Sequence, residues 1–533
     1  MKISKKINIL DCTFRDGGYY NLWNFDEKLS KEYLKRISES KIDYIEIGFL
    51  FLKDKKKIFG KFAFANKKFF AKFKINHKKI AIMFNGSDLL EKNIEEKLEI
   101  NLPLEKSSNL KLIRIATHYN EIFKLKKIIK FIKKKNFKVA INLMQITELS
   151  KSKILKAVKF IENNNLADIF YFADSLGSLN PKNTKKICSI INECWKKPFG
   201  IHAHDNCGLA LENTITALKN GATWADATIS GMGRGAGNVS TESLIRKLNS
   251  IGFNDYKFKP LNILAKGKFS EMKRKYGWGK SEYYKLAAKF KIHPTYIQEI
   301  LSNKNLNQNE INSLIKKLHK YQKNLTKFDS NIINNEIISP NHKKLWNAKN
   351  FLKNKNLLIL GQGESLKTSR SKIIKYKKKY NCKIFSLNLN QYYKHDEVDC
   401  VIVTDKIRAL LDFQNYAKYK NIIMPKDNFI KILPKNFIKS LNIKNFGMKI
   451  NSKRILFNNK YCETPTALSL GYAIGLGVIG NANRIFLAGF DGYPIQNNYQ
   501  LEMENLIDDI HKMNIKNLYS ITPTKYNIKK HKL

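Results

Sequence analysis

The sequence predicts an α/β protein, with an N-terminal (β/α)8 barrel, a helical extension and a C-terminal open, Rossmann-like α/β domain. Two observations predict the barrel. Residues 1–250 contain eight short apolar runs with helix-length intervals between most of them, which fits a closed parallel barrel better than an open sheet. The polar motifs of this region all fall where a run ends, and barrels of this kind carry their chemistry at the carboxyl ends of their strands.

The predicted strands are short apolar runs, and the Lys-rich amphipathic stretches between them predict the outer helices. The eight runs are Ile7–Asp11, Tyr44–Phe49, Ile80–Phe84, Leu112–Thr117, Val139–Met144, Ile169–Ala173, Gly200–His204 and Trp224–Ile229.

Two further segments follow the barrel. Residues 251–345 have a helical pattern and predict a helical extension with a linker. The strand pattern restarts near residue 356, so residues 356–533 are predicted as the Rossmann-like domain. Its expected strands are Leu357–Leu360, Ile384–Leu389, Val401–Thr404 and Arg484–Ala488, with a helix at Ala467–Ile479.

The composition narrows the class of protein. The chain has 533 residues, of which 43% are hydrophobic, so intrinsic disorder is excluded for most of it. The net charge of +52 comes from 87 Lys and only 10 Arg, spread along the whole chain. Because Arg makes the bidentate contacts to bases and phosphates, this pattern argues against a nucleic-acid partner. A Lys-rich polyanion-binding protein is kept as a third functional hypothesis.

The sequence also predicts the cellular setting. No apolar run reaches the roughly 18 residues of a membrane span, and the N-terminus has no signal-peptide apolar region. The seven cysteines are odd in number and lack CxxC spacing, so we expect reduced thiols rather than disulfides or a zinc site. We therefore predict a cytoplasmic protein.

A pair of histidines suggests a metal site. His202 and His204 are separated by one residue, so on a strand both imidazoles face the same side. Asp16, just after the first predicted strand, could add an oxygen ligand. Two imidazoles and a carboxylate with open positions suit a divalent cation that polarises a substrate oxygen.

Six motifs in the first 300 residues resemble the metal-dependent aldolase and Claisen-type acyltransferase superfamily. This superfamily includes 4-hydroxy-2-oxovalerate aldolase, isopropylmalate synthase and 3-hydroxy-3-methylglutaryl-CoA lyase. The motifs keep the family's order: DCTFRDGG (11–18), IEIGF (45–49), IRIATH (113–118), ADSLG (173–177), HAHDNCGLAL (202–211) and GMGRGAGN (231–238).

The resemblance implies roles for particular residues. Asp16, His202 and His204 would bind Mn²⁺ or Mg²⁺, with Asn238 as a fourth ligand. Arg15 corresponds to the arginine that stabilises the enolate oxygen of a 2-oxo acid. Asp174, Ser175 and Arg234, which lie in two of the motifs, are predicted to contact substrate together with Arg15.

The general base is left open by a departure from the family. The aldolases carry a histidine four residues after the motif arginine, where this chain has Tyr19. Tyr19, Glu46 and His118 are the candidates, since each could reach a site at the ends of the strands. Tyr19 is equally well explained as an aromatic wall of the pocket, and Glu46 as an ion-pair partner of Arg15.

The leading functional hypothesis is an aldolase that acts through the enolate of pyruvate or a related 2-oxo acid, with an aldehyde as second substrate. A role in surface polysaccharide precursor synthesis is a guess that follows from the fused second domain. The alternative is a Claisen-type transfer between an acyl-CoA and a 2-oxo acid. Members of this family commonly pair, so a homodimer is expected.

A glycine-rich turn opens the second domain. Gly361, Gly363 and Ser365 follow the apolar run Leu357–Leu360 and precede a basic helix. Backbone N–H groups at such a turn can hold a phosphate. We therefore predict a phosphate-binding turn there, although only two glycines of the dinucleotide fingerprint are present.

Overall fold

The computed structural model describes residues 3, 6–52, 59–72, 79–103, 109–253, 255–303, 306–333, 345–430, 432–451, 454–493 and 498–533. The chain forms two compact units. The first comprises Met1–Lys304 and Leu325–Phe328, and the second comprises Asn305–Asn324 and Asp329–Leu533.

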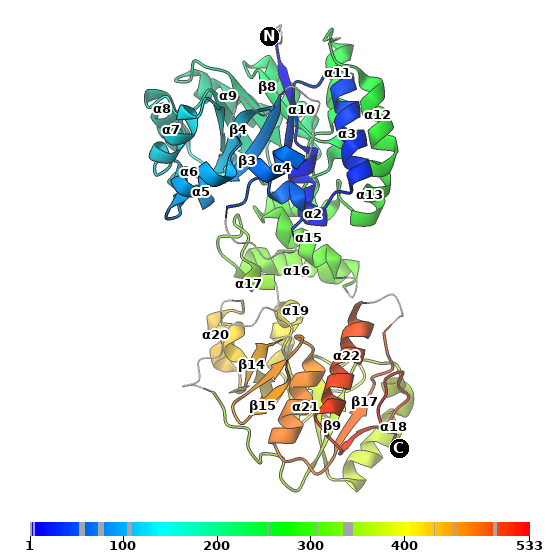
Figure 1. Ribbon diagram of the computed structural model, residues 1–533. Helices are drawn as coiled ribbons and strands as arrows, with labels where there is room; N and C mark the ends of the chain where they lie inside the picture. The colour runs from blue at the N-terminus through cyan, green and yellow to red at the C-terminus, as the bar shows by residue number, and fades with distance from the viewer. Residues whose placement is uncertain are drawn as a thin grey trace. The chain divides into compact units, whose positions relative to one another are not determined.

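The first unit is built on a closed barrel of eight parallel strands in sequence order (Figure 1). Strand β1 pairs with both β2 and β8, which closes the barrel. Its strands agree with the predicted runs to within two residues at each end: β1 Asn8–Asp11, β2 Tyr44–Phe49, β3 Ile80–Asn85, β4 Leu110–Thr117, β5 Lys138–Leu143, β6 Ile169–Asp174, β7 Phe199–Ala203 and β8 Trp224–Ala227.

Amphipathic helices surround the barrel, as their alternating Lys-rich and apolar sequences require. They are α3 Glu27–Glu39, α4 Lys67–Lys72, α5 Ile94–Asn101, α7 Lys126–Lys134, α8 Lys151–Asn163, α9 Pro181–Asn192, α10 Ala210–Lys219 and α11 Thr241–Ser250. Three single-turn helices, α1 Thr13–Asp16, α2 Gly18–Asn21 and α6 Tyr119–Ile122, follow β1 and β4.

The inside of the barrel has an apolar layer near the start of the strands. Nine buried side chains form it: Leu10, Cys12, Tyr44, Ala81, Leu112, Ala140, Ile169, Tyr171 and Trp224. Because every second residue of a strand faces inward, the next inward positions on β2, β4 and β8 are Glu46, Arg114 and Asp226. The sequence therefore places a layer of charge above the apolar layer.

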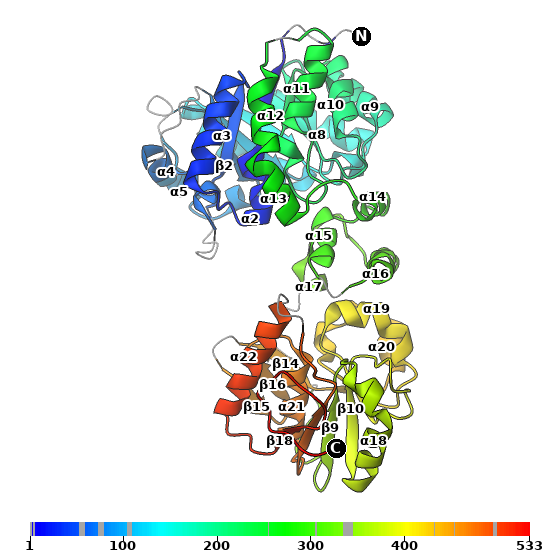
Figure 2. The same cartoon turned by 90° about the vertical axis from the view of Figure 1, so that its right-hand side faces the viewer.

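The helical extension comprises α12 Phe258–Lys266, α13 Lys268–Tyr276, α14 Glu282–Lys289 and α15 Pro294–Ser302. Figures 1 and 2 both place α15 at the same end of the barrel as α2. Side chains fix it to the loops that follow barrel strands. Trp278 Nε1 donates to Ser230 O at 3.0 Å, and Gln145 Nε2 donates to Thr326 O at 2.5 Å. The extension therefore lies against the carboxyl ends of the strands.

The second unit contains an open, seven-stranded parallel sheet in the order β13-β12-β11-β10-β9-β17-β18. Its strands are β9 Asn356–Leu360, β10 Cys382–Leu387, β11 Cys400–Ile402, β12 Ile422–Met424, β13 Ile443–Asn445, β17 Ile485–Ala488 and β18 Leu518–Ser520. All four strands predicted from the sequence are present, whereas the three-residue strands β12, β13 and β18 were not predicted.

A small mixed sheet and seven helices complete the described part of the second unit. The small sheet consists of β14 Gly447–Ile450, β15 Leu456–Asn458 and β16 Tyr461–Thr464. The helices are α16 Gln308–Tyr321, α17 Ser330–Ile333, α18 Ser365–Lys379, α19 Lys406–Tyr416, α20 Lys435–Ser440, α21 Ser469–Ile479 and α22 Asn498–Lys512.

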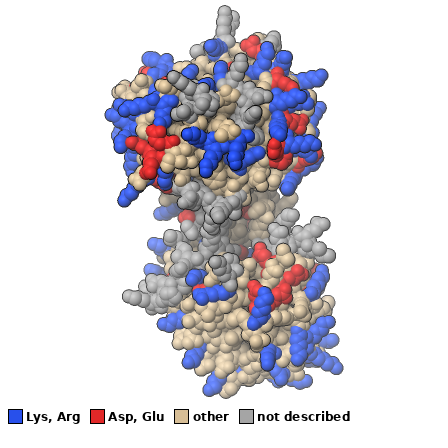
Figure 3. Space-filling model, viewed as in Figure 1, with Lys and Arg blue, Asp and Glu red and all other residues tan. Residues whose placement is uncertain are grey.

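The charged side chains on the surface and the state of the cysteines agree with what the composition predicts. Figure 3 shows Lys and Arg side chains on both units, with Asp and Glu interspersed among them. All seven cysteines are free thiols, as predicted. In the described part of the chain, no helix has both the length and the hydrophobicity that a bilayer crossing requires.

Candidate metal and substrate site

The turn after β1 is built around Asp11. This carboxylate is fully buried, and its Oδ1 accepts hydrogen bonds from Tyr33 OH at 2.5 Å and from Thr13 Oγ1 at 2.6 Å. Its Oδ2 accepts from Thr241 Oγ1 at 2.6 Å. Burial raises the pKa of Asp11 above its ordinary value. These bonds hold α1 against the barrel and present Arg15 and Asp16 to its interior.

Arg15 begins a closed ring of charged side chains inside the barrel. Its Nε donates to Glu46 Oε2 at 2.8 Å, and its Nη1 donates to Asp16 Oδ1 at 2.5 Å. Glu46 Oε2 also pairs with Arg114 Nη1 at 3.2 Å. Arg114 Nη2 donates to Asp226 Oδ2 at 2.6 Å.

His202 closes the ring. Its Nδ1 lies 3.0 Å from Asp226 Oδ2, and its Nε2 lies 3.3 Å from Asp16 Oδ2. All six members of the ring are less than 9% exposed: Arg15, Asp16, Glu46, Arg114, His202 and Asp226. The ring gives each buried charge an opposite partner, which is the condition under which buried charges are tolerated.

The ring controls the protonation of its members. Burial alone would raise the pKa of Asp16, but the charge of Arg15 and the hydrogen bond to His202 hold it well below its usual range. Burial alone would lower the pKa of His202, but the bonds to Asp16 and Asp226 raise it. Burial, reinforced by the charge of His202, lowers the pKa of His204 to about 3. Asp16 is therefore ionised and His204 neutral, as metal ligands must be, and His202 would release its proton when a cation binds.

Asp16, His202 and His204 fit a divalent cation. Their ligand atoms lie within 4.8 Å of one another, and all three side chains are buried. Among the residues that the structure describes, His204 Nδ1 and Asn238 Oδ1 are buried polar atoms without a hydrogen-bond partner, and such atoms call for a ligand or an ion. Asp226 fixes the ring of His202 from behind, as a carboxylate does behind many metal-binding histidines.

Cys12 also lies near this cluster, since Cys12, His202 and Asp226 form a second group of potential ligands. Two observations make it the poorer site. Burial raises the pKa of the Cys12 thiol well above its ordinary value, and Asp226 Oδ2 is already paired with Arg114. A thiol must lose its proton to bind a metal, so the set with Asp16 is the better one.

Asn238 ends the glycine-rich loop after β8. Its Nδ2 donates to Asp16 Oδ2 at 2.5 Å, and its backbone bridges to His204. Only glycine fits at Gly237, where φ is +83° and an added Cβ would lie 2.0 Å from Gly231 O. The loop thus needs its glycines to bring Asn238 beside the predicted metal ligands.

We expect Gly237→Ala to destabilise the first unit by more than the roughly 1–2 kcal/mol that a left-handed non-glycine residue costs. The added methyl group must displace the carbonyl of Gly231, and Asn238 would move with the loop. The matched control is Gly252→Ala, where φ is +96° and nothing lies within 4 Å of an added Cβ. Thermal unfolding and Mn²⁺ titration check both variants, and equal effects would contradict the prediction.

Arg234 lies in the same loop and stacks over the ring of Tyr19, with Cζ 4.7 Å from the ring centroid. Its Nε is buried and has no hydrogen-bond partner in the described part of the chain. Tyr19 also contacts Trp23, with ring centroids 5.2 Å apart. Tyr19 therefore packs between a guanidinium and an indole ring.

The other two candidate bases have structural partners. Glu46 is fully buried, and its Oε2 is shared between Arg15 and Arg114. His118 precedes α6, where Glu121 accepts a hydrogen bond from its backbone N–H at 2.9 Å. Burial lowers the pKa of His118.

Asp174 and Ser175 stabilise loops. The two oxygens of Asp174 accept the N–H groups of Ser178 and Leu179, each at 3.0 Å. Ser175 Oγ accepts from Gln145 N at 3.0 Å. Burial raises the pKa of Asp174 to about 6. These bonds satisfy atoms that the sequence assigns to substrate, so Arg15 and Arg234 are the stronger candidates for substrate contact.

Three residues near the site were not singled out from the sequence. Arg114 and Asp226 occupy strands predicted as buried, and a charge at such a position requires a partner. That rule marks each of them as needing a partner but does not say which residue the partner is. His293 lies in the helical extension, and the next residue, Pro294, packs on Gly235 of the glycine-rich loop after β8. No sequence pattern brings residue 293 to the barrel.

In the second unit, the glycine-rich turn lies at the carboxyl end of β9. Ser365 N donates to Asp491 Oδ2 at 2.9 Å, and Ser365 Oγ also donates to this carboxylate. An added Cβ at Gly363 would lie 2.4 Å from Asp491 Cγ. A phosphate at Gly361, Gly363 and Ser365 would therefore have to displace a carboxylate.

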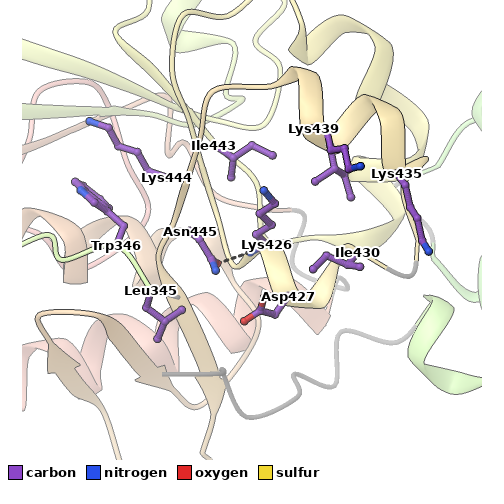
Figure 4. A pocket seen from close by; sticks show the side chains of 11 residues that line it. Leu345, Trp346, Lys426, Asp427, Ile430, Lys435, Lys439, Ile443, Lys444 and Asn445 are labelled. Carbon is purple, nitrogen blue, oxygen red and sulfur yellow. Dashed lines mark hydrogen bonds between the residues drawn. The ribbon is translucent and has the colours of Figure 1, made fainter. Parts of the chain in front are cut away.

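A cavity of about 630 Å³ lies elsewhere in this unit, beside the edge strand β13 (Figure 4). Its lining is mainly apolar and cationic, with one acidic residue, Asp427. Lys444 Nζ lies 4.9 Å from the ring centroid of Trp346. Further lining side chains are Lys426, Ile430, Lys435, Ile438 and Lys439. The cavity does not include the glycine-rich turn.

Comparison with known proteins gives matches to the barrel. The family model described as HMGL-like matches residues 6–265. The 4-hydroxy-2-oxovalerate aldolase of Pelotomaculum thermopropionicum is 29% identical over 248 residues, which are 46% of this chain and 71% of that protein. The protein of the same name from Carboxydothermus hydrogenoformans is 28% identical over 264 residues, 47% of this chain and 73% of that protein.

A solved structure gives a similar result. "Crystal structure of the N-terminal domain of a putative aldolase from Bacteroides vulgatus" is 33% identical to this chain with a TM-score of 0.51. The match covers 56% of this chain and 98% of that one.

Proposed function

Because the N-terminal half of this chain belongs to the HMGL-like family, we propose that it is a divalent-metal-dependent aldolase acting on a 2-oxo acid through its enolate. The observation that carries the proposal is the buried ring of charge, which fixes Arg15 beside Asp16 and the two histidines. Mn²⁺ or Mg²⁺ would be held by Asp16, His202 and His204, with Asn238 as a further ligand.

Arg15 is the group proposed to stabilise the enolate. Glu46 and Asp16 hold its Nε and Nη1, and among the described residues none hydrogen-bonds to its Nη2. A guanidinium fixed in advance stabilises charge that develops on a substrate oxygen without further reorganisation. A bound divalent cation would add Lewis-acid polarisation of the substrate. Arg234 is proposed to bind the substrate carboxylate.

The proposed cleavage is a retro-aldol reaction of a 4-hydroxy-2-oxo acid. The 4-hydroxyl loses its proton to a base, and the bond between C3 and C4 breaks. The electron pair of that bond forms the enolate of C2 and C3, while C4 becomes the aldehyde carbonyl. Tyr19, Glu46 and His118 remain the predicted bases, and protonation of C3 releases the 2-oxo acid.

The test is deuterium exchange at the methyl group of pyruvate in D₂O, followed by NMR with and without Mn²⁺. We expect metal-dependent exchange in the wild type. Arg15→Ala should slow it about 10²–10³-fold, the usual loss when one donor to an oxyanion is removed. The exposed Arg454, in the second unit, provides the control Arg454→Ala.

Two results would overturn the proposal. Protein that binds Mn²⁺ but exchanges neither pyruvate nor 2-oxobutyrate would contradict enolate formation on a 2-oxo acid. Thiol release from an acyl-CoA, with no reaction between pyruvate and aldehydes, would favour the Claisen-type transfer instead.

A further inference from the structure

His293 precedes α15 in the helical extension and is 8% exposed. Its side chain caps the helix, because Nδ1 accepts a hydrogen bond from Thr295 N at 3.4 Å. Its backbone N–H donates to Leu325 O at 2.8 Å, and its ring packs near Phe328, with ring centroids 6.2 Å apart. These contacts fix both the position and the orientation of the imidazole.

The cap determines which nitrogen of His293 carries the proton. A neutral imidazole has one donor and one acceptor nitrogen. Since Nδ1 is the acceptor, the proton lies on Nε2. Burial, together with the positive charge of Arg234, holds the pKa of His293 well below its ordinary value, so the ring is neutral at pH 7. Within the described part of the chain, no group accepts a hydrogen bond from Nε2.

His293 lies over the loop that shapes the site. An added Cβ at Gly235 would lie 2.7 Å from Pro294 Cβ, so the backbone of this loop touches the start of α15. Gly235 directly follows Arg234, and its carbonyl accepts a hydrogen bond from Tyr20 OH at 2.9 Å. His293 directly precedes Pro294, so it lies where the start of α15 packs on the glycine-rich loop after β8, next to Arg234.

We propose that His293 donates a hydrogen bond from Nε2 to the oxygen of the aldehyde substrate. This inference rests on the proposed aldolase function and extends it to the second substrate. The proposed N–H donor belongs to the helical extension, so none of the six motifs of the barrel contains it.

The role follows from charge development during carbon–carbon bond formation. The enolate carbon attacks the aldehyde carbon, and the π electron pair of the carbonyl moves to oxygen as an alkoxide. A neutral imidazole N–H polarises that carbonyl and stabilises the alkoxide, as a neutral histidine held by a helix N-terminus does in other enzymes. The alkoxide then takes a proton from solvent water. In the cleavage direction the same N–H stabilises the alkoxide before the bond breaks.

Two substitutions separate the catalytic role of His293 from its role as a helix cap. His293→Asn keeps an acceptor near Nδ1 for Thr295 N–H but has no donor at Nε2. His293→Gln places an amide donor near Nε2 and weakens the cap. The measurements are condensation of pyruvate with acetaldehyde, glycolaldehyde and glyceraldehyde, methyl exchange of pyruvate, Mn²⁺ affinity and thermal unfolding. His511→Asn, an exposed histidine on α22, is the control.

We expect His293→Asn to lower kcat/KM for condensation about 10²–10³-fold, and His293→Gln to stay within about tenfold of the wild type. Methyl exchange should stay nearly unchanged in both, because that half-reaction has no aldehyde oxygen. A purely structural cap predicts the reverse order, with Asn harmless and Gln damaging, and that order would overturn the inference.

The remaining outcomes are also decisive. Equal condensation by both variants and the wild type would overturn the inference and leave the proposed function intact. Absence of metal-dependent methyl exchange in the wild type would refute the proposed function itself. Exchange without condensation of any of the three aldehydes would contradict the role of His293, since no aldehyde oxygen would be involved.

Discussion

The double variant Asp16→Asn/His202→Ala is expected to lose Mn²⁺ binding and to lower the rate of pyruvate methyl exchange more than about 10³-fold, since a metal supplies several kcal/mol of charge stabilisation. Both changes remove atoms of the buried ligand group. Asp16→Asn also removes a negative partner of Arg15. Calorimetric titration with Mn²⁺ and the NMR exchange measurement check the two effects separately.

The matched control is Asp396→Asn/His395→Ala, which changes the same residue types at exposed positions of the second unit. It should bind Mn²⁺ and exchange pyruvate as the wild type does. Full exchange activity in Asp16→Asn/His202→Ala, in folded protein, would refute the proposed site. If this double variant lost Mn²⁺ binding but kept methyl exchange of pyruvate, the enolate would form without the cation.

Removal of a single carboxylate from the charged ring should strongly destabilise the barrel. We expect Asp226→Ala to cost about 3–5 kcal/mol, because it leaves the buried Arg114 and His202 without this partner. At about 2–4 °C per kcal/mol, the melting temperature of the first unit should fall by roughly 6–20 °C. Differential scanning calorimetry would measure the shift.

An exposed ion pair provides the comparison. Lys151 and Glu193 lie 2.7 Å apart, with their side chains 54% and 42% exposed. Glu193→Gln should change stability by at most about 0.5 kcal/mol, because solvent already screens such a pair. If Asp226→Ala were as mild as Glu193→Gln, the ring would not be the element that holds charge inside the barrel.

The ring of charged side chains also explains how the barrel can contain six buried ionisable residues. Six ionisable groups would each be costly to bury alone. Arranged in alternation, they hold one another and fix Arg15 and Asp16 in place. The stability of the barrel and the chemistry of the site therefore depend on the same contacts. A variant that weakens these contacts should lower both stability and activity. Activity should be compared only among variants whose folding has been measured.

Local patterns in the sequence determined much of the fold. Each barrel strand is a buried apolar run, and burial on both faces leaves a continuous hydrophobic signature that can be read residue by residue. The polar motifs at the ends of those runs predicted the end of the barrel where the site lies. Alternation along a strand placed His202 and His204 on one side, and the two imidazoles lie together in the structure.

Other features depended on contacts between distant residues. Arg114 and Asp226 meet across 112 positions in the chain, and nothing in either local sequence specifies the partner. His293 comes beside the glycine-rich loop after β8 only because the extension packs on the barrel loops. Asp491 meets Ser365 only because β17 lies beside β9. The sequence by itself determined the strands and the ends that carry polar groups, since local periodicity encodes both. Only the tertiary structure decided which buried charges, caps and loops complete the site, because long-range packing sets those pairings.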